Sequence, residues 1–120
     1  MKILVVDDDQ DILNVVKTIL YTHGHEVECF SDAVQAISRA KETEFEFVLL
    51  DYKMPNNDGI WFMENIKLPR KTKILLITAY INREVINRMF ALGISGYLVK
   101  PFGEEDLLRH VEFFSSPQTV

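Results

Sequence analysis

The chain has 120 residues and a hydrophobic content of 48%, which is the size of one compact domain and too apolar for a disordered chain. Its formal net charge of −5 argues against nonspecific nucleic-acid binding, and no apolar run is long enough to span a bilayer. No signal-peptide pattern opens the sequence and the single cysteine, Cys29, cannot form an internal disulfide, so we expect a cytoplasmic protein.

Short β-branched and apolar runs alternate along the chain with segments of helical periodicity. The runs predict strands over residues 2–6, 26–30, 47–50, 73–78 and 97–99. The periodic segments predict helices over about 9–21, 31–40, 60–67, 82–92 and 104–114. Asp9 is expected to cap the first helix and Gly24 to close it, while Gly93 is expected to end the fourth.

Five strands that alternate with five helices predict a parallel sheet covered by helices on both faces. We therefore predict an α/β fold, a single-domain flavodoxin-like (βα)5 doubly wound sheet with strand order 2-1-3-4-5. The domain is expected to span residues 1–114. Residues 115–120 are expected to form a frayed tail or the start of a linker.

Three carboxylates follow the two strands that flank the switch point of this topology. Asp7 and Asp8 end the first strand, and Asp51 ends the third. Because ligands of open α/β sheets bind at this crevice, these side chains are expected to form one site. Their mutual repulsion calls for a hard cation. We predict Mg²⁺, with Mn²⁺ or Ca²⁺ as substitutes. Asp8 and Asp51 are the expected direct ligands together with the backbone carbonyl of Lys53, and Asp7 is expected to act directly or through water.

Two further side chains complete the predicted site. Lys100 ends the fifth strand and can place an ammonium group in the same crevice, and Thr78 ends the fourth strand with a hydroxyl. Ala79 is small enough to keep the pocket open. A carboxylate nucleophile, a metal, a lysine and a hydroxyl together indicate phosphoryl transfer to aspartate.

Four motifs, each at a predicted strand end, carry a resemblance to a known family. The chain resembles the receiver domain of two-component response regulators over essentially its whole length. The matching segments are Val5–Asp9, Leu50–Gly59, Ile77–Ala79 and Tyr97–Phe102.

The resemblance implies a role for each matching residue. It implies that Asp51 accepts a phosphoryl group from a sensor histidine kinase or a histidine phosphotransfer protein. It implies that Asp7 and Asp8 organise Mg²⁺, that Lys100 contacts the phosphoryl group, and that the Lys100-Pro101 bond is cis. It further implies that Thr78 moves toward the phosphate while Tyr97 turns inward.

A signalling output is expected to follow from that switch. We expect the surface of the fourth helix, fifth strand and fifth helix to bind an effector or a second copy, with Ile86 and Phe90 as candidate contacts. On the first helix, Ile12, Val15 and Ile19 form an edge that is a candidate docking site for the phosphodonor. Ordinary core packing is an equally good reading of that edge.

Lys53 and Tyr80 are expected to flank the phosphate, each two residues beyond a site residue. We predict that they screen the phosphoryl group and slow its hydrolysis. The alternative is that both simply line a solvated rim, and the sequence does not favour either reading.

The sequence argues against three alternative functions. A magnesium phosphohydrolase usually has a second acid two residues after its nucleophile, where this chain has Lys53. A flavin-binding module needs a Ser/Thr/Gly-rich loop in place of Asp7-Asp8-Asp9. The third alternative is a receiver-like module that signals without phosphate. Such a module does not need the acidic site, so the complete site in this chain argues against it. The expected protein is thus no enzyme on other substrates and promotes only its own phosphorylation and dephosphorylation.

Overall fold

The computed structural model describes residues 1–79 and 82–115. The elements follow the predicted alternation: β1 (Lys2–Val6), α1 (Gln10–Thr22), β2 (Glu26–Phe30), α2 (Ala33–Glu42), β3 (Phe47–Asp51), α3 (Gly59–Asn65), β4 (Lys73–Thr78), α4 (Arg83–Leu92), β5 (Gly96–Val99) and α5 (Glu104–Ser115). All strand pairs are parallel, and the sheet order β2-β1-β3-β4-β5 confirms the predicted topology.

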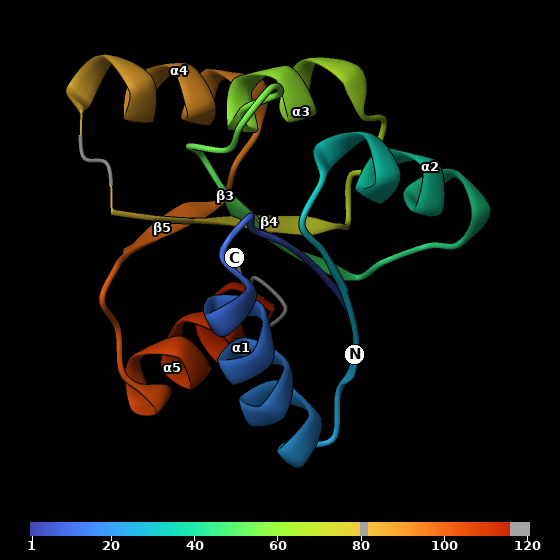
Figure 1. Cartoon of the computed structure of the whole chain (residues 1–120), viewed down its shortest axis with the longest axis vertical. Helices are drawn as coiled ribbons and strands as arrows, with labels where there is room; N and C mark the ends of the chain where they lie inside the picture. The colour runs from blue at the N-terminus through green and yellow to red at the C-terminus, as the bar shows by residue number, and fades with distance from the viewer. Residues whose placement is uncertain (80–81, 116–120) are drawn as a thin grey trace, which may run out of the picture.

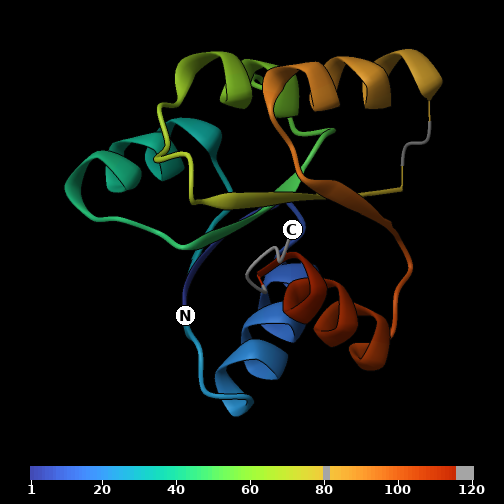
Figure 2. The same ribbon diagram turned by 180° about the vertical axis from the view of Figure 1, so that it is seen from behind.

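Helices cover both faces of the central sheet. Figure 1 shows α2, α3 and α4 on one side and α1 and α5 on the other, and Figure 2 shows the same layers from behind. Right-handed crossovers produce this division, because β2 lies on one side of β1 and the later strands are added on the other side. The molecule therefore has three layers with the sheet buried in the middle.

Each face of the sheet has its own hydrophobic core, because successive strand residues point to opposite sides. Leu4, Val48 and Leu76 pack beneath α2, α3 and α4, whereas Ile3, Leu49 and Leu75 pack against α1 and α5. The central strands β1, β3 and β4 are buried on both faces. Continuous apolar runs in the sequence are the signature of such strands.

The helix ends follow local capping chemistry. Asp9 accepts hydrogen bonds from the N–H groups of Asp11 and Ile12, and Asn82 caps α4 in the same way. Gly93 has a φ of 114° at the end of α4, a left-handed conformation that suits glycine. None of the helices in the described ranges is both long and apolar enough to cross a membrane.

Several helix boundaries differ from the prediction by one or two residues, including those of the second helix, which was predicted over 31–40 and spans Ala33–Glu42. The third helix, predicted over 60–67, spans Gly59–Asn65, because the backbone is already extended at Ile66 ahead of Pro69. The last helix continues one residue beyond the predicted end, to Ser115. The rest of the tail predicted over 115–120 lies outside the described residues.

Strand register places the ends of β1 and β3 side by side. Val6 pairs with Leu50, so the next residues, Asp7 and Asp51, leave the sheet at the same edge. On the other side of β3, Asp51 pairs with Ile77, one residue before Thr78. Polar residues that are far apart in the sequence therefore meet where three neighbouring strands end.

Candidate functional site

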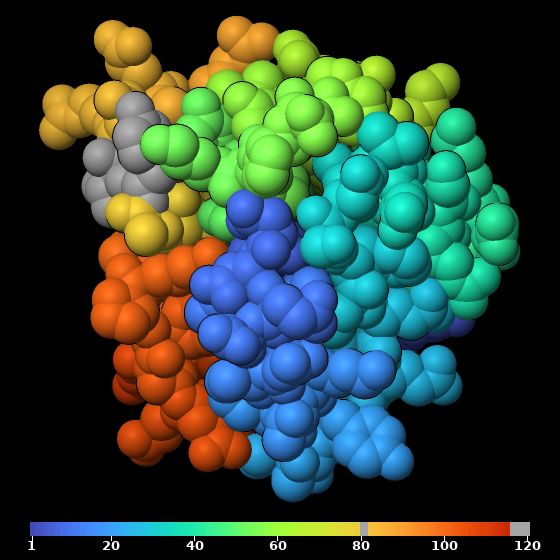
Figure 3. All heavy atoms as spheres, viewed as in Figure 1, coloured from blue at the N-terminus to red at the C-terminus, as the bar shows by residue number. Residues whose placement is uncertain are grey.

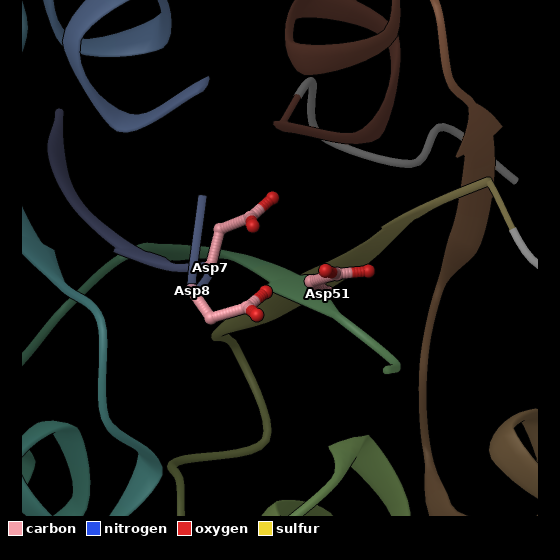
Figure 4. Close-up of side chains that lie close together, drawn as sticks. All are labelled: Asp7, Asp8 and Asp51. Carbon is pink, nitrogen blue, oxygen red and sulfur yellow. The ribbon is translucent and has the colours of Figure 1, made fainter. Parts of the chain in front are cut away.

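Three carboxylates converge at the carboxyl edge of the sheet. One carboxylate oxygen from each of Asp7, Asp8 and Asp51 lies within 4.8 Å of the others. Figure 4 shows the three side chains close together, with those of Asp7 and Asp8 at the end of β1 and that of Asp51 at the end of β3. The structure thus brings together the three acids that the sequence predicts as one cluster.

Burial distinguishes the members of this cluster. Asp7 is fully buried and Asp51 is 5% exposed, whereas Asp8 faces solvent. The backbone around Asp7 holds it in place, since its N–H donates to the Phe30 carbonyl at 3.1 Å and its Oδ1 accepts from the Asp9 N–H at 2.9 Å. The site therefore has two desolvated acids beneath one that solvent can reach.

Lys100 supplies a positive charge between the two buried acids. Its Nζ lies 2.7 Å from Asp7 Oδ2 and 3.3 Å from Asp51 Oδ2. The Lys100 N–H donates to the Thr78 carbonyl at 2.9 Å, and the Lys100-Pro101 bond is cis, as the sequence implies. Burial lowers the pKa of Lys100, but its contacts with Asp7 and Asp51 outweigh this effect and the pKa is raised overall.

The carboxyl group of Asp51 is difficult to ionise in this setting. Burial, together with the negative charge of Asp7, raises the pKa of Asp51 from 3.8 to about 6, although Lys100 acts in the opposite direction. One lysine therefore leaves the negative charge of the cluster incompletely neutralised. A further cation at this place is electrostatically favourable.

The donor set fits magnesium. Among the described residues, Asp7 Oδ2 is the buried side-chain oxygen that lacks a well-directed hydrogen bond, because the ammonium of Lys100 lies close to it only as an ion pair. Mg²⁺ prefers oxygen ligands and usually combines one or two carboxylates with several waters. A buried oxygen that is paired only with Lys100, beside an exposed carboxylate, offers such a combination.

An open cavity of about 620 Å³ lies over these groups. It is lined by Asp8, Asp51, Lys53, Met54, Pro55, Thr78, Ala79 and Lys100. Figure 3 shows the segments that follow β1, β3, β4 and β5, coloured blue, green, yellow and orange, meeting on one face of the molecule. A small molecule from solvent can therefore reach Asp51 without passing through the core.

The predicted residues around the acids occupy different positions relative to the cavity. Thr78 is fully buried in the cavity wall, and the exposed Lys53 lies at its rim. Tyr80, the second predicted rim residue, lies outside the described residues. Met54 and Pro55 also line the cavity. Neither was predicted as a site residue, and the apolar character of Met54 gave no signal for a site.

Tyr97, the predicted switch residue, points outward. It is 42% exposed and meets the ring of Phe90 on α4 edge to face, with centroids 6.3 Å apart. Phe90 is exposed as well, whereas Ile86 packs partly against the core. A groove of about 470 Å³ runs beside these rings from α4 to α5, and Phe113 and Phe114 line its far end.

The edge of α1 is only partly available for docking. Ile12 and Ile19 pack against the core beneath the sheet, which agrees with the ordinary packing interpretation. Val15 is 54% exposed and is the most exposed residue of the three.

The loop after Asp51 ends in a helix cap and a close backbone contact. Asp58 caps α3 by accepting a hydrogen bond from the Trp61 N–H at 2.9 Å. Gly59 begins the helix, and its N–H donates to the Tyr52 carbonyl at 2.7 Å. An acid followed by glycine ahead of an apolar run is a recognisable helix start.

Comparison with known proteins supports one family. The family model for the response regulator receiver domain matches residues 3–112. The chemotaxis protein CheY-3 of Vibrio cholerae is 37% identical over 106 residues, which cover 85% of this chain and 82% of CheY-3. Several other relatives are longer proteins, and the chain spans between 12% and 51% of their lengths.

Solved structures have the same fold. The chemotaxis protein CheY4 of Vibrio cholerae superposes with a TM-score of 0.88 at 32% identity, over 94% of this chain and 97% of that one. The receiver domain of a sensor histidine kinase from Pseudomonas aeruginosa, with a magnesium ion in its active site cleft, gives a TM-score of 0.82 at 25% identity, over 95% of this chain and 96% of that one.

The family model covers nearly all of the chain, and its matched region contains every acid of the cluster as well as Thr78 and Lys100. The chain belongs to the response regulator receiver domain family of two-component signal transduction.

Proposed function

We propose that this receiver domain, over residues 1–114, accepts one phosphoryl group on Asp51 in the cytoplasm. The donor is a phosphohistidine of a sensor histidine kinase or of a histidine phosphotransfer protein. The observation that carries the proposal is the position of Asp51, a buried carboxylate between a second buried acid and Lys100 at the floor of an open cavity. No other substrate is turned over.

The transfer exchanges one bond to phosphorus for another. An oxygen of Asp51 forms the new P–O bond while the P–N bond of the phosphohistidine breaks, and the imidazole retains the electron pair and takes a proton from solvent. Lys100, already 3.3 Å from Asp51 Oδ2, stabilises the negative charge on the phosphoryl oxygens. Asp51 has to be ionised to attack, so its pKa of about 6 leaves it competent at neutral pH.

Asp7, Asp8, Asp51 and the backbone carbonyl of Lys53 would hold a magnesium ion beside the acceptor oxygen. When bound, Mg²⁺ supplies positive charge that offsets the charge on the phosphoryl group. Mn²⁺ or Ca²⁺ can take its place with less suitable geometry. The magnesium ion in the related receiver domain from Pseudomonas aeruginosa supports this assignment.

Phosphorylation then changes the output surface. The added group carries about −1.5 to −2 charge, and the Thr78 hydroxyl in the cavity wall moves to hydrogen-bond it. The shift opens space toward which Tyr97 turns inward, and the surface of α4, β5 and α5 changes shape. That surface binds an effector or a second copy of the chain, because phosphorylation favours the conformation that interacts with it better.

The phosphoryl lifetime depends on the rim of the cavity. Lys53 and Tyr80 screen the phosphoryl group from the hydrolytic water. The double variant Lys53→Asn/Tyr80→Ala should shorten the half-life of the phosphorylated protein. An unchanged half-life, measured by intact mass after removal of the donor, refutes the screening role while leaving the acceptor role of Asp51 intact.

The experiment that tests the proposal is incubation with Mg²⁺ and acetyl phosphate, followed by intact mass measurement. Wild type should gain one phosphoryl group and Asp51→Ala should gain none. Asp32→Ala is the matched control, because Asp32 caps α2 away from the cavity and its variant should be phosphorylated like wild type. Equal phosphorylation of Asp51→Ala would overturn the proposal.

A further inference from the structure

Gly59 lies directly against the backbone that carries the phosphoacceptor. Gly59 is buried, and its N–H donates to the Tyr52 carbonyl at 2.7 Å. This hydrogen bond joins the first residue after β3 to the first residue of α3. The loop over residues 52–58 is therefore closed at its base by Gly59.

The contact leaves no room for a side chain. A Cβ atom on Gly59 would lie 3.0 Å from Tyr52 Cα and 3.1 Å from the carbonyl oxygen of Asp51. Both neighbours are backbone atoms of β3 or its direct continuation, so neither can rotate away as a side chain can. The third neighbour, Met89 Cε at 3.3 Å, ends a flexible side chain and can move. Alanine at this position therefore has to displace the backbone at Asp51 and Tyr52 by a few tenths of an ångström.

The displaced segment is the one that forms the site. Asp51 provides the acceptor carboxylate, and Lys53, one residue beyond Tyr52, provides the carbonyl that we assign to the metal. Mg²⁺ requires nearly octahedral coordination at about 2.0–2.1 Å, so it tolerates small ligand displacements poorly. We infer that Gly59 is a positioning residue for the magnesium and phosphoacceptor site, acting through the backbone from Asp51 to Lys53. This inference rests on the function proposed above.

A role in packing alone has a different consequence. Gly59 would then matter only for the stability of the fold, and an alanine variant that still folds would bind Mg²⁺ like wild type. A positioning role predicts weaker Mg²⁺ binding by the folded protein, beyond any loss of stability. The two roles are therefore separated by measuring affinity and stability on the same variant.

The chain offers a matched control in Gly103, which precedes α5. A Cβ atom on Gly103 would meet nothing within 4 Å. We expect Gly59→Ala to weaken Mg²⁺ binding about tenfold by calorimetric titration at a temperature where the variant is folded. Gly103→Ala should bind Mg²⁺ with the affinity of wild type. Equal affinities for wild type, Gly59→Ala and Gly103→Ala would overturn the inference.

A measurement on wild type covers the case in which Gly59→Ala does not fold. Hydrogen exchange of the Gly59 amide reports the opening of its bond to Tyr52. Mg²⁺ should slow this exchange more than it slows exchange at Leu107 in α5, whose amide donates to the carbonyl of the preceding Gly103. Equal effects at the two amides would contradict a positioning role. If wild type binds no Mg²⁺ at all, the proposed function itself fails, which is a different result from equal binding by all three proteins.

Discussion

Asp51 lies where ionisation of its carboxyl group is unfavourable but where a reactant can reach it from the cavity. Its side chain is almost fully buried beside Asp7, and only Lys100 opposes the resulting rise in its pKa. Burial and the charge of Asp7 disfavour the ionised carboxylate of Asp51. The same two features favour a bound cation, and they favour a phosphoryl group whose charge lies farther from Asp7. At the scale of the residue, the negative charges of the site therefore repel each other, and a bound cation would reduce that repulsion.

The raised pKa of Asp51 predicts how the free energy of unfolding depends on pH. The pKa of Asp51 is about 6 in the folded chain, above its ordinary value of 3.8. The folded chain therefore keeps a proton that the unfolded chain releases, and the contribution of Asp51 to the unfolding free energy falls as pH rises from about 4 to about 6. In metal-free buffer, Asp51→Asn should raise the unfolding free energy at pH 7.5 by between about 1 and 3 kcal/mol and have little effect at pH 4.

Urea denaturation in the presence of a chelator measures this difference. Asp32→Asn is the control, because asparagine is an equally good helix cap and Asp32 lies apart from the acidic cluster. An Asp51→Asn variant that is no more stable than wild type at pH 7.5 would show that Lys100 already neutralises the cluster.

At the scale of the elements, two helices present apolar side chains on opposite sides of the sheet. On α4, Phe90 packs edge to face against Tyr97 of β5, and both rings are exposed. On α1, Val15 is exposed while its neighbours Ile12 and Ile19 contact the core. We propose that the Phe90–Tyr97 pair takes part in the output of the signal and that Val15 takes part in recognition of the phosphodonor.

The contact between Phe90 and Tyr97 should hold the switch residue outward. An aromatic pair contributes about 0.5–1.5 kcal/mol, so removing the Phe90 ring should favour the inward conformation of Tyr97 by severalfold. We therefore expect Phe90→Ala to be phosphorylated by acetyl phosphate about twofold to tenfold faster than wild type, measured by intact mass over time. Phe113→Ala removes a more exposed ring that packs on Phe114 instead, and it should react at the wild-type rate. Equal rates for the two variants would assign Phe90 no part in the switch.

Val15 should serve recognition of the phosphodonor protein. A buried carboxylate in an interface is unfavourable, so Val15→Asp should slow phosphotransfer from the partner's phosphohistidine by tenfold or more, about 1.4 kcal/mol. Phosphorylation by acetyl phosphate should not change, because the small donor touches no helix surface. Val34→Asp, which alters an exposed valine on α2, is the control. Loss of reactivity toward both donors in Val15→Asp would indicate damage to the site in place of lost docking.

At the scale of the whole molecule, the fold gathers negative charge at one edge of the sheet. The ends of β1 and β3 bring two buried acids together, and the two hydrophobic cores hold those strands rigidly in register. A cation bound there links strands that are distant in the sequence. Binding to the folded chain alone must then stabilise the entire domain.

Magnesium should therefore raise the unfolding free energy of the wild-type domain. At a concentration ten times the dissociation constant, the increase should be about 1.4 kcal/mol, as measured by thermal or urea denaturation. Asp7→Asn should lose most of this increase because it removes the charge of a fully buried acid of the cluster. Sodium chloride at the same ionic strength serves as the control for screening. A Mg²⁺ effect equal to that of sodium chloride would mean that the acids bind no specific ion.

The fold was predictable from the sequence because its signals are local and strong. Apolar runs such as Phe47–Leu50 predict buried strands, and the alternation with helices limits the topology to few choices. The approach of Asp7, Asp8 and Asp51 followed from that topology. The ion pair of Asp7 Oδ2 with Lys100 and the outward position of Tyr97 against Phe90 were not predictable, because they depend on side-chain packing between elements. The contact of Gly59 with the Asp51 backbone depends on how closely α3 approaches β3, which no local pattern encodes.

The most direct test of the account is to locate the phosphoryl group after reaction with acetyl phosphate, with and without Mg²⁺. Borohydride reduction of the phosphorylated protein, followed by peptide mass mapping, identifies the carboxylate that carried it. The account predicts one modified residue, Asp51, and modification only when Mg²⁺ is present. Modification of a different residue, or equal modification of Asp51 in the presence of a chelator, would contradict it.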